Sequence, residues 1–270
     1  MNDQSASSIA VEDRLVRVGD DAISIRWLRP PGVASDAPVV VFLHEGLGSI
    51  GMWMDFPHKL VASLGCRGLI YERNGHGNTL PIRAPRAQSW MHDEAWLVLP
   101  ALLDTLGVER PILFSHSDGA TIALLYASRF RPCGVVSEAA HIFVDELSAN
   151  GLGKVEAQRR KGSMGDFLKQ FHAGDYDAMV GAWLDFWREG RERNWDMVAD
   201  LAGVSCPVLA IQGALDEYGT VRQLDGIVAG VSGPAERLLI EGCGHVPHLQ
   251  AQDAVLGAAS KFIRPLLARA

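Results

Sequence analysis

Short apolar runs recur along the chain and predict the strands of a sheet. Residues 14–18 and 23–28 alternate between apolar and polar side chains, which is typical of an antiparallel pair with one face in water. Gly19, Asp20 and Asp21 between them suit a hairpin turn. The later runs are unbroken stretches rich in Val, Ile and Leu, which predict parallel strands buried on both faces. These later runs are residues 39–43, 68–71, 112–114, 135–136, 208–211 and 237–240.

Segments with the apolar spacing of helices separate these runs. They are residues 52–64, 89–106, 120–131, 221–228 and 251–267. Strands that alternate with helices in this way predict an α/β fold, in which helices cover both faces of the sheet. We therefore expect an α/β protein with an eight-stranded, mostly parallel sheet.

One long segment breaks the alternation. No proline occurs between Pro132 and Pro207, and two sets of apolar residues there have the spacing of a helix face. The sets are Met164, Phe167, Leu168 and Phe171, and Val180, Trp183, Leu184 and Trp187. We predict a helical cap at residues 143–203, inserted after the sixth strand into a core of residues 1–142 and 204–270. Such an insert would cover the carboxyl ends of the strands, where open sheets bind ligands, so we expect Trp183 and Trp187 in a substrate pocket.

Composition and charge exclude several classes of protein. With 48% hydrophobic and 21% charged residues, the chain has enough apolar surface to fold. Its formal net charge is −7, whereas proteins that bind nucleic acids or anionic membrane surfaces are typically basic. No apolar run is long enough to span a bilayer, and residues 1–5 lack the features of a signal peptide, so we expect a cytoplasmic protein. Four scattered cysteines predict neither disulfides nor a zinc site.

The strongest chemical signal lies at residues 111–120, where a buried strand runs through Ser115, Ser117 and Gly119 into a helix. Small residues flank Ser117, as a very sharp strand-to-helix turn requires. The pattern resembles the nucleophile elbow, G-x-S-x-G, of the α/β-hydrolase superfamily, with Ser115 in place of the first glycine. The resemblance implies that Ser117 is an exposed nucleophile on a strained turn.

Two later loops complete the resemblance to this superfamily. The loop after the seventh strand reads G-x-x-D and ends at Asp216, with Glu217 as the alternative acid. The loop after the eighth strand reads G-H-x-P-H and contains His245. The superfamily places its acid and its histidine in this chain order. The resemblance therefore implies a catalytic triad of Ser117, His245 and Asp216.

The loop that follows the third strand is the expected source of one oxyanion-hole donor. Its sequence His-Glu-Gly-Leu-Gly resembles the His-Gly-x loop of the superfamily but has Glu45 inserted. The resemblance implies a backbone N–H from Leu47, or alternatively Gly46, together with the N–H of Asp118. The loop at residues 72–78 resembles the superfamily's D-x-R-G-x-G-x-S turn, and it does not match the G-x-G-x-x-G pattern of a cofactor site.

Glu45 and His141 are further candidates for the pocket. A carboxylate in this loop would oppose the negative charge of an oxyanion, so we expect Glu45 to turn away and pair with an arginine such as Arg73. The alternative is that Glu45 contacts the nucleophile or the substrate. His141 follows the sixth strand, near the expected pocket mouth, where it would either contact substrate or serve a structural role.

The resemblance implies a serine hydrolase, but the fold alone does not choose the bond. We expect hydrolysis of a small, soluble carboxylic ester, lactone or thioester through an acyl-enzyme on Ser117. The nearest rival is hydrolysis of a C–C bond in a vinylogous diketone from aromatic catabolism. A cofactor-free dioxygenase using a His–Asp dyad and a non-catalytic binding protein on the same scaffold are further alternatives. We expect a small-molecule partner and no metal or cofactor, and leave a homodimer open.

Overall fold

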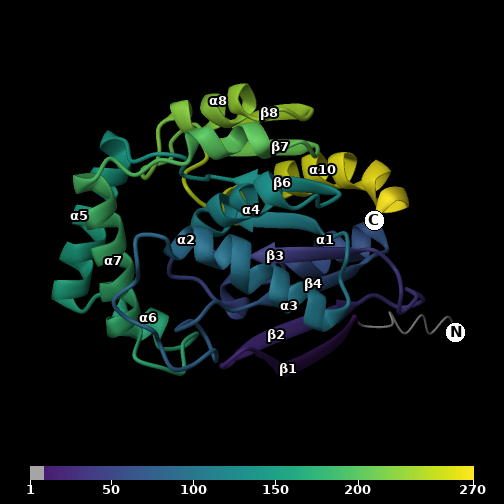
Figure 1. The fold of residues 1–270 in the computed structure, drawn as a ribbon, viewed down its shortest axis with the longest axis horizontal. Helices are drawn as coiled ribbons and strands as arrows, with labels where there is room; N and C mark the ends of the chain where they lie inside the picture. Colours follow the sequence, from purple (N-terminus) through teal and green to yellow (C-terminus); the bar gives the residue numbers. More distant parts are fainter. Residues whose placement is uncertain (1–8) are drawn as a thin grey trace, which may run out of the picture.

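Eight strands form one sheet in the computed structural model, which describes residues 9–270 (Figure 1). The prediction that the chain has no signal peptide rests on residues 1–5, which lie outside the described residues. The strand order is β1-β2-β4-β3-β5-β6-β7-β8. The strands are β1 (Ala10–Val18), β2 (Asp21–Arg29), β3 (Val39–Leu43), β4 (Arg67–Tyr71), β5 (Ile112–His116), β6 (Gly134–Glu138), β7 (Val208–Gly213) and β8 (Ala235–Ile240).

The strand directions follow the apolar patterns. β1 and β2 form the expected antiparallel hairpin through Gly19, whose φ of +58° suits glycine. β2 also pairs antiparallel with β4, and the pairs among the remaining strands are parallel. The predicted eight-stranded, mostly parallel α/β sheet is therefore confirmed. β1 is longer than predicted and begins at Ala10.

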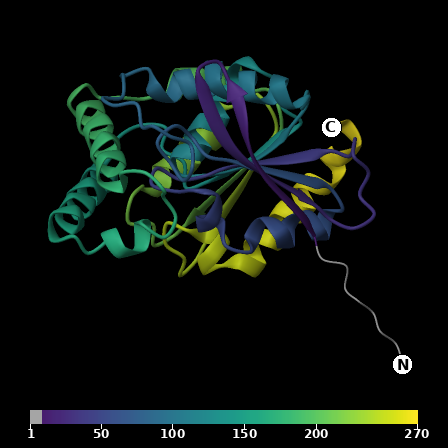
Figure 2. The ribbon, with the colours of Figure 1, turned by 90° about the horizontal axis from the view of Figure 1, so that it is seen from below.

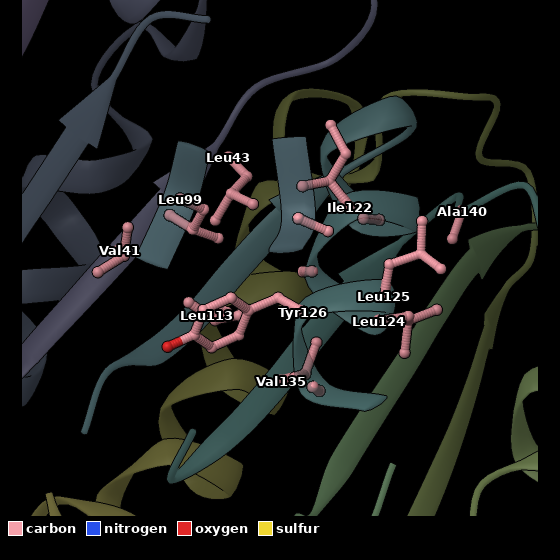
Figure 3. Close-up of a cluster of buried hydrophobic side chains, with 14 of the residues drawn as sticks. Val41, Leu43, Leu99, Leu113, Ile122, Leu124, Leu125, Tyr126, Val135 and Ala140 are labelled. Atoms are coloured by element: carbon pink, nitrogen blue, oxygen red, sulfur yellow. The ribbon is translucent and has the colours of Figure 1, made fainter. Parts of the chain in front are cut away.

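Helices cover both faces of the sheet (Figure 2). Successive residues of a strand point to opposite faces, so Val41 packs with α3 and α4 while Phe42 packs with α1 and α10. Figure 3 shows part of the α4 side, where Leu113 of β5 and Tyr126 of α4 belong to one apolar cluster. The helices that flank the sheet are α1 (Phe56–Leu64), α2 (Trp90–Asp93), α3 (Leu99–Leu106), α4 (Asp118–Arg129), α8 (Val221–Gly230), α9 (Pro247–Gln250) and α10 (Gln252–Ile263).

Three α-helices occupy the chain between β6 and β7 and lie beyond one end of the sheet (Figure 1). They are α5 (Glu146–Lys161), α6 (Gly165–Leu168) and α7 (Tyr176–Glu192). They share a small apolar core that includes Val155, Leu168 and Leu184. The apolar spacing predicted a longer helix around Phe167 than the single turn of α6. The division of the chain into core and cap stays a prediction.

Short helical segments of other types complete the chain. Three are 3-10 helices, namely η1 (Ile50–Trp53), η3 (Val198–Gly203) and η4 (Arg264–Arg269). η2 (Glu94–Val98) is a π-helix that joins α2 to α3 within the predicted helical region 89–106. Within residues 9–270, no helix combines the length and apolar character needed to cross a membrane.

The turn from β5 into α4 brings the start of the helix very close to the end of β3. Ser117 has φ +53° and ψ −119°, a strained conformation for a residue with a side chain. A Cβ atom at Gly119 would overlap the Leu43 carbonyl oxygen and lie 2.5 Å from that of His44. Backbone oxygens cannot move aside as a flexible side chain can. Glycine is therefore required for α4 to start directly against β3.

Substitution Gly119→Ala tests this constraint. We expect the variant to unfold more easily, by about 2 kcal/mol or more, because the clash is with backbone. Gly257→Ala is the matched control, since Gly257 is an exposed residue of α10 with no atom near its added Cβ. The control should be neutral or more stable by up to about 1 kcal/mol. Denaturant unfolding of both variants makes the comparison, and equal stabilities would contradict the constraint.

Candidate active site

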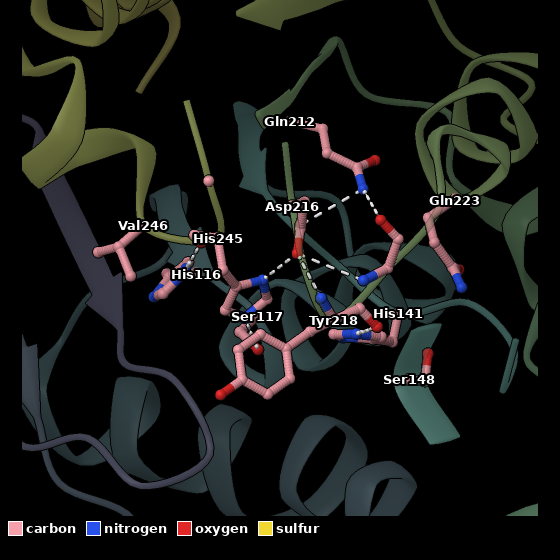
Figure 4. Close-up of polar contacts among 12 residues, drawn as sticks. His116, Ser117, His141, Ser148, Gln212, Asp216, Tyr218, Gln223, His245 and Val246 are labelled. Atoms are coloured by element: carbon pink, nitrogen blue, oxygen red, sulfur yellow. Dashed lines mark hydrogen bonds and ion pairs between the residues drawn. The ribbon is translucent and has the colours of Figure 1, made fainter. Parts of the chain in front are cut away.

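Ser117, His245 and Asp216 converge at the carboxyl ends of the strands (Figure 4). The Oγ atom of Ser117 lies 3.0 Å from Nε2 of His245. Nδ1 of the same imidazole lies 2.9 Å from Oδ1 of Asp216. Each residue comes from a different loop, after β5, β8 and β7 respectively. This chain of contacts can move a proton from the hydroxyl to the imidazole and stabilise the resulting cation.

The Asp216 carboxylate is held in place on both oxygens. Oδ1 accepts backbone N–H groups from Tyr218 at 2.9 Å and Gly219 at 3.3 Å, and Oδ2 accepts from the Gln212 amide at 3.3 Å. Burial acts to raise the pKa of Asp216, but His245 outweighs it and the pKa lies below its ordinary value. The carboxylate therefore stays charged beside the imidazole. The alternative acid, Glu217, lines the pocket instead.

The backbone around Ser117 leaves donors free for an oxyanion. Asp118 is the first residue of α4, so its N–H has no acceptor within the helix. In the loop after β3, the N–H of Gly48 donates to the carbonyl of Glu45 at 3.1 Å and closes a turn. The two residues inside this turn, Gly46 and Leu47, line the pocket. The structure thus brings all three expected donor residues to the Ser117 side of the pocket.

Trp183 and Trp187 both reach the residue after the candidate nucleophile. The indole N–H of Trp183 donates to Oδ2 of Asp118 at 3.0 Å, and that of Trp187 donates to Oδ1 at 3.2 Å. Asp118 is buried, so these two donors satisfy a charge that water does not reach. Both tryptophans also line the pocket. The sequence showed that they share one helix face but gave no sign of a carboxylate partner.

A cavity of about 380 Å³ lies over Ser117 and beneath the helices α5–α7. Its wall on the helical side is mainly apolar and includes Leu152, Val155, Met164, Phe167 and Leu168, together with the polar Ser148 and Gln158 of α5. Among the residues that the structure describes, no lysine or arginine lines it. Its acidic lining residues are Glu45, Asp118 and Glu217. The cavity therefore suits an apolar group, and its excess of acidic side chains over lysine and arginine disfavours an anion.

His141 and Tyr218 lie on the His245 side of this cavity (Figure 4). Nε2 of His141 is 3.1 Å from the Tyr218 carbonyl oxygen, and burial lowers the pKa of this imidazole. The Tyr218 ring lies against His245, with ring centres 4.7 Å apart. The sequence analysis missed Tyr218, although its position two residues after Asp216 placed it beside the triad.

Glu45 does not pair with Arg73, contrary to the expectation from the sequence. The guanidinium of Arg73 donates to the carbonyl oxygens of His44 and Glu45 instead. The Glu45 carboxylate, with its side chain 23% exposed, lies 3.6 Å from Nδ1 of His116. Nε2 of His116 in turn lies 2.7 Å from the carbonyl oxygen of His245. Arg73 was the wrong partner because the backbone carbonyls of the loop, rather than the carboxylate, face it.

The ion pair changes the pKa values of both partners. Burial acts to raise the pKa of Glu45, but the contact with His116 outweighs it and brings the pKa to about 2. Burial acts to lower the pKa of His116, but Glu45, Glu138 and the His245 carbonyl together outweigh it and the pKa is raised. Both shifts favour the charged forms of the two side chains, so the pair offsets the negative charge near the candidate oxyanion site without contact to Ser117.

The fold and the converging Ser–His–Asp set define a protein of the α/β-hydrolase class. The model of the Alpha/beta hydrolase family matches residues 40–258, and the chain belongs to this family. A segment of 82 residues is 35% identical to epoxide hydrolase A of Mycobacterium tuberculosis (strain ATCC 25618 / H37Rv). That match covers 30% of this chain and only 26% of the relative.

Solved structures share the fold over nearly the whole chain. The 2-hydroxy-6-oxo-6-phenylhexa-2,4-dienoate hydrolase (BphD) from Rhodococcus sp. strain RHA1 has a TM-score of 0.77 at 16% identity, covering 95% of this chain and 100% of its own. The enol-lactonase from Burkholderia xenovorans LB400 has a TM-score of 0.70 at 18% identity, covering 92% and 99%. At these identities the likeness concerns the fold.

Substitution Glu45→Gln tests the ion pair with His116. The raised pKa of His116 stabilises the fold fully below about pH 6.5, and this contribution is lost as pH rises through the folded-state pKa. The lowered pKa of Glu45 contributes above about pH 4.5 and is lost as pH falls toward 2. The unfolding free energy of wild type should therefore exceed that of Glu45→Gln by the largest amount between about pH 4.5 and pH 6.5.

Two measurements check this prediction. Denaturant unfolding from pH 4 to 9 should show the difference shrink above the folded-state pKa of His116, and NMR titration should show that pKa fall in the variant. We expect kcat to change less than stability, because the carboxylate touches no triad atom. A His116 titration that is identical in both proteins would contradict the ion pair.

Proposed function

We propose that this protein is a serine hydrolase of small, uncharged carboxylic esters, lactones or thioesters. The observation that carries the proposal is the hydrogen-bonded chain from Ser117 through His245 to Asp216. Such an arrangement activates a hydroxyl as a nucleophile. Ser117 is only 6% exposed and faces the apolar cavity, which supports a reaction shielded from bulk water.

In the first half of the proposed reaction, Ser117 Oγ attacks the substrate carbonyl carbon while its proton passes to Nε2 of His245. The carbonyl oxygen takes up negative charge opposite the N–H of Asp118 and the loop donors. The imidazolium then gives its proton to the leaving alcohol or thiol as the bond to carbon breaks. An acyl group remains on Ser117.

In the second half, water replaces the leaving group. His245 takes a proton from water, the hydroxide attacks the acyl carbon, and the proton returns to Ser117 Oγ as the acid leaves. Asp216, held charged by its donors, stabilises the imidazolium in both halves. No other group is required for atoms and protons to balance.

The lining of the cavity supports an uncharged substrate. A dienoate, the compound for which the Rhodococcus hydrolase is named, carries a carboxylate that would need a cationic or strongly donating partner when buried. The described lining has three acidic residues, Glu45, Asp118 and Glu217, and no lysine or arginine. Its remaining groups are mainly apolar, with uncharged polar side chains such as Ser148 and Gln158 among them. This composition favours ester-type hydrolysis over C–C hydrolysis of an anionic diketone.

The identity of the nucleophile also weighs against epoxide opening, despite the name of the relative from Mycobacterium. Attack of Ser117 Oγ on an epoxide carbon would give an ether. Water activated by His245 does not hydrolyse an ether as it hydrolyses an ester, so the enzyme would stay alkylated. A carbonyl substrate avoids this block, because its acyl-enzyme contains an ester bond.

Substitution Ser117→Ala tests the proposed mechanism. We expect kcat for p-nitrophenyl butyrate to fall by roughly 10³- to 10⁶-fold, because the acyl-enzyme cannot form. Ser128→Ala is a control at the far end of α4, where the hydroxyl only caps a carbonyl. A fluorophosphonate should label wild type and the control but not Ser117→Ala. A wild-type serine that is inert to the label would favour a binding protein, and ester hydrolysis that survives in Ser117→Ala would show that Ser117 is not the nucleophile.

A matched pair of esters tests the charge of the substrate. Wild type should hydrolyse p-nitrophenyl butyrate with a kcat/KM at least about 100-fold above that for mono-p-nitrophenyl succinate, because a carboxylate in the cavity would be buried beside acidic side chains and without a lysine or arginine. The two substrates have the same leaving group and acyl chains of similar length. Equal or greater activity on the succinate would overturn the proposal of an uncharged substrate. It would then favour C–C hydrolysis of an anionic diketone.

A further inference from the structure

Four consecutive carbonyl groups of the loop after β3 are held by buried side chains. Arg73 donates to the carbonyl oxygen of His44 at 2.5 Å and to that of Glu45 at 2.6 Å. Nε2 of His76 lies 2.9 Å from the Gly46 carbonyl oxygen. Nε2 of His172 lies 3.0 Å from that of Leu47. We call Arg73, His76 and His172 the carbonyl clamp.

The clamp determines where the amide groups of the loop point. In a trans peptide the N–H points away from the preceding carbonyl. When Arg73 holds the Glu45 carbonyl, the N–H of Gly46 faces the other way, and His76 has the same effect on the N–H of Leu47. The N–H of Gly48 is already used in the turn to Glu45. Gly46 and Leu47 therefore carry the loop amides that remain available to a ligand, and both residues line the cavity.

The tautomer of His172 is fixed by its surroundings. The backbone N–H of Gly77 donates to Nδ1 of His172 at 2.9 Å, so Nδ1 is an acceptor and the ring proton lies on Nε2. That proton points to the Leu47 carbonyl. The side chain is 6% exposed, and burial lowers the pKa of the imidazole, so it stays neutral. A second proton on Nδ1 would oppose the Gly77 N–H.

His172 differs from the other clamp residues in its origin. Arg73 and His76 belong to the loop after β4, next to the sheet, whereas His172 lies between α6 and α7. The neighbouring N–H of Ala173 donates to the Gly77 carbonyl at 3.0 Å, so the two segments exchange backbone and side-chain hydrogen bonds. Together with the hydrogen bond from His172 to the Leu47 carbonyl, these contacts connect the helical segment over the cavity to the loop after β3.

We propose that His172 is a positioning residue for the oxyanion hole, and that it makes the hole depend on the docking of the helical segment. The proposal rests on the proposed hydrolase function. His172 touches neither substrate nor triad. It holds the Leu47 carbonyl and so orients the next N–H, that of Gly48, which closes the turn to Glu45 around the two donor residues. Arg73 and His76 orient the Gly46 and Leu47 amides themselves, and the closed turn keeps these amides directed into the cavity before substrate arrives. Preorganised donors of this kind stabilise the transition state more than the bound substrate.

The test compares three variants with wild type. His172→Leu removes both hydrogen bonds, and His172→Gln retains an amide oxygen for Gly77 and an amide N–H for Leu47. His92→Leu is the matched control, because His92 is a half-buried histidine whose contacts are with Asp200 and Trp96. The measurements are kcat and KM for p-nitrophenyl butyrate, the inhibition constant of a trifluoromethyl ketone, and the melting temperature.

The trifluoromethyl ketone reports on the hole directly. Ser117 Oγ adds to its carbonyl carbon, the proton passes to His245, and the ketone oxygen becomes an oxyanion. His172→Leu should lower kcat and ketone affinity together, by roughly 10- to 100-fold, with KM changed less than about threefold. His172→Gln should recover most of both values, and His92→Leu should match wild type. A merely structural role would lower the melting temperature without this joint loss.

Two outcomes are decisive against the inference. A folded His172→Leu variant with wild-type kcat and ketone affinity would overturn it, as would equal losses in His92→Leu. If wild type hydrolyses no ester, the proposed function fails, and the amide chemical shifts measured by NMR then test the carbonyl clamp separately. In that case the amide signals of Gly46 and Leu47 should shift in His172→Leu but not in His92→Leu, and unchanged signals would overturn the clamp itself.

Discussion

The contact of α4 with β3 is the constraint on which the site depends. The helix begins so close to the strand that a Cβ atom at Gly119 would overlap the carbonyls of Leu43 and His44. The chain can turn this sharply only because Ser117 adopts a positive φ. The strain places the hydroxyl above the sheet and leaves the N–H of Asp118 without a helical acceptor. The same contact sets the loop after β3 beside the nucleophile, so one backbone approach assembles nucleophile and donors together.

Buried charges around this turn are each matched to a specific partner. Asp118 accepts two indole N–H groups, Asp216 faces His245, and Glu45 faces His116. An unmatched carboxylate near Ser117 would disfavour a developing oxyanion. The pairing also joins segments far apart in the chain, since Trp187 comes from α7 and His116 contacts the histidine loop. The same contacts that compensate the buried carboxylates therefore also hold the segments of the site in place.

The helices α5–α7 contribute more than a cover over the cavity. They supply its apolar wall, the two donors to Asp118, and the imidazole that holds the Leu47 carbonyl. Val155, Leu168 and Leu184 form a small apolar core of their own, whereas Phe186 and Trp187 of α7 belong to the core on the α4 face of the sheet. The segment is therefore anchored to the sheet by apolar packing, and its polar contacts reach the reacting centre. The same segment therefore shapes the cavity for the substrate and helps to align the N–H donors of the oxyanion hole.

The sequence alone determined the sheet and the candidate triad, because both depend on local patterns. Unbroken apolar runs mark buried strands, and the short motifs at Ser117, Asp216 and His245 follow strands whose ends meet at one edge. The partner of Glu45, the clamp at Leu47 and the ligands of Asp118 were decided only by tertiary structure. His172 lies 125 residues from Leu47, and Trp187 lies 69 from Asp118. No local pattern encodes such pairs, since they depend on how the helical segment packs against the loops of the sheet.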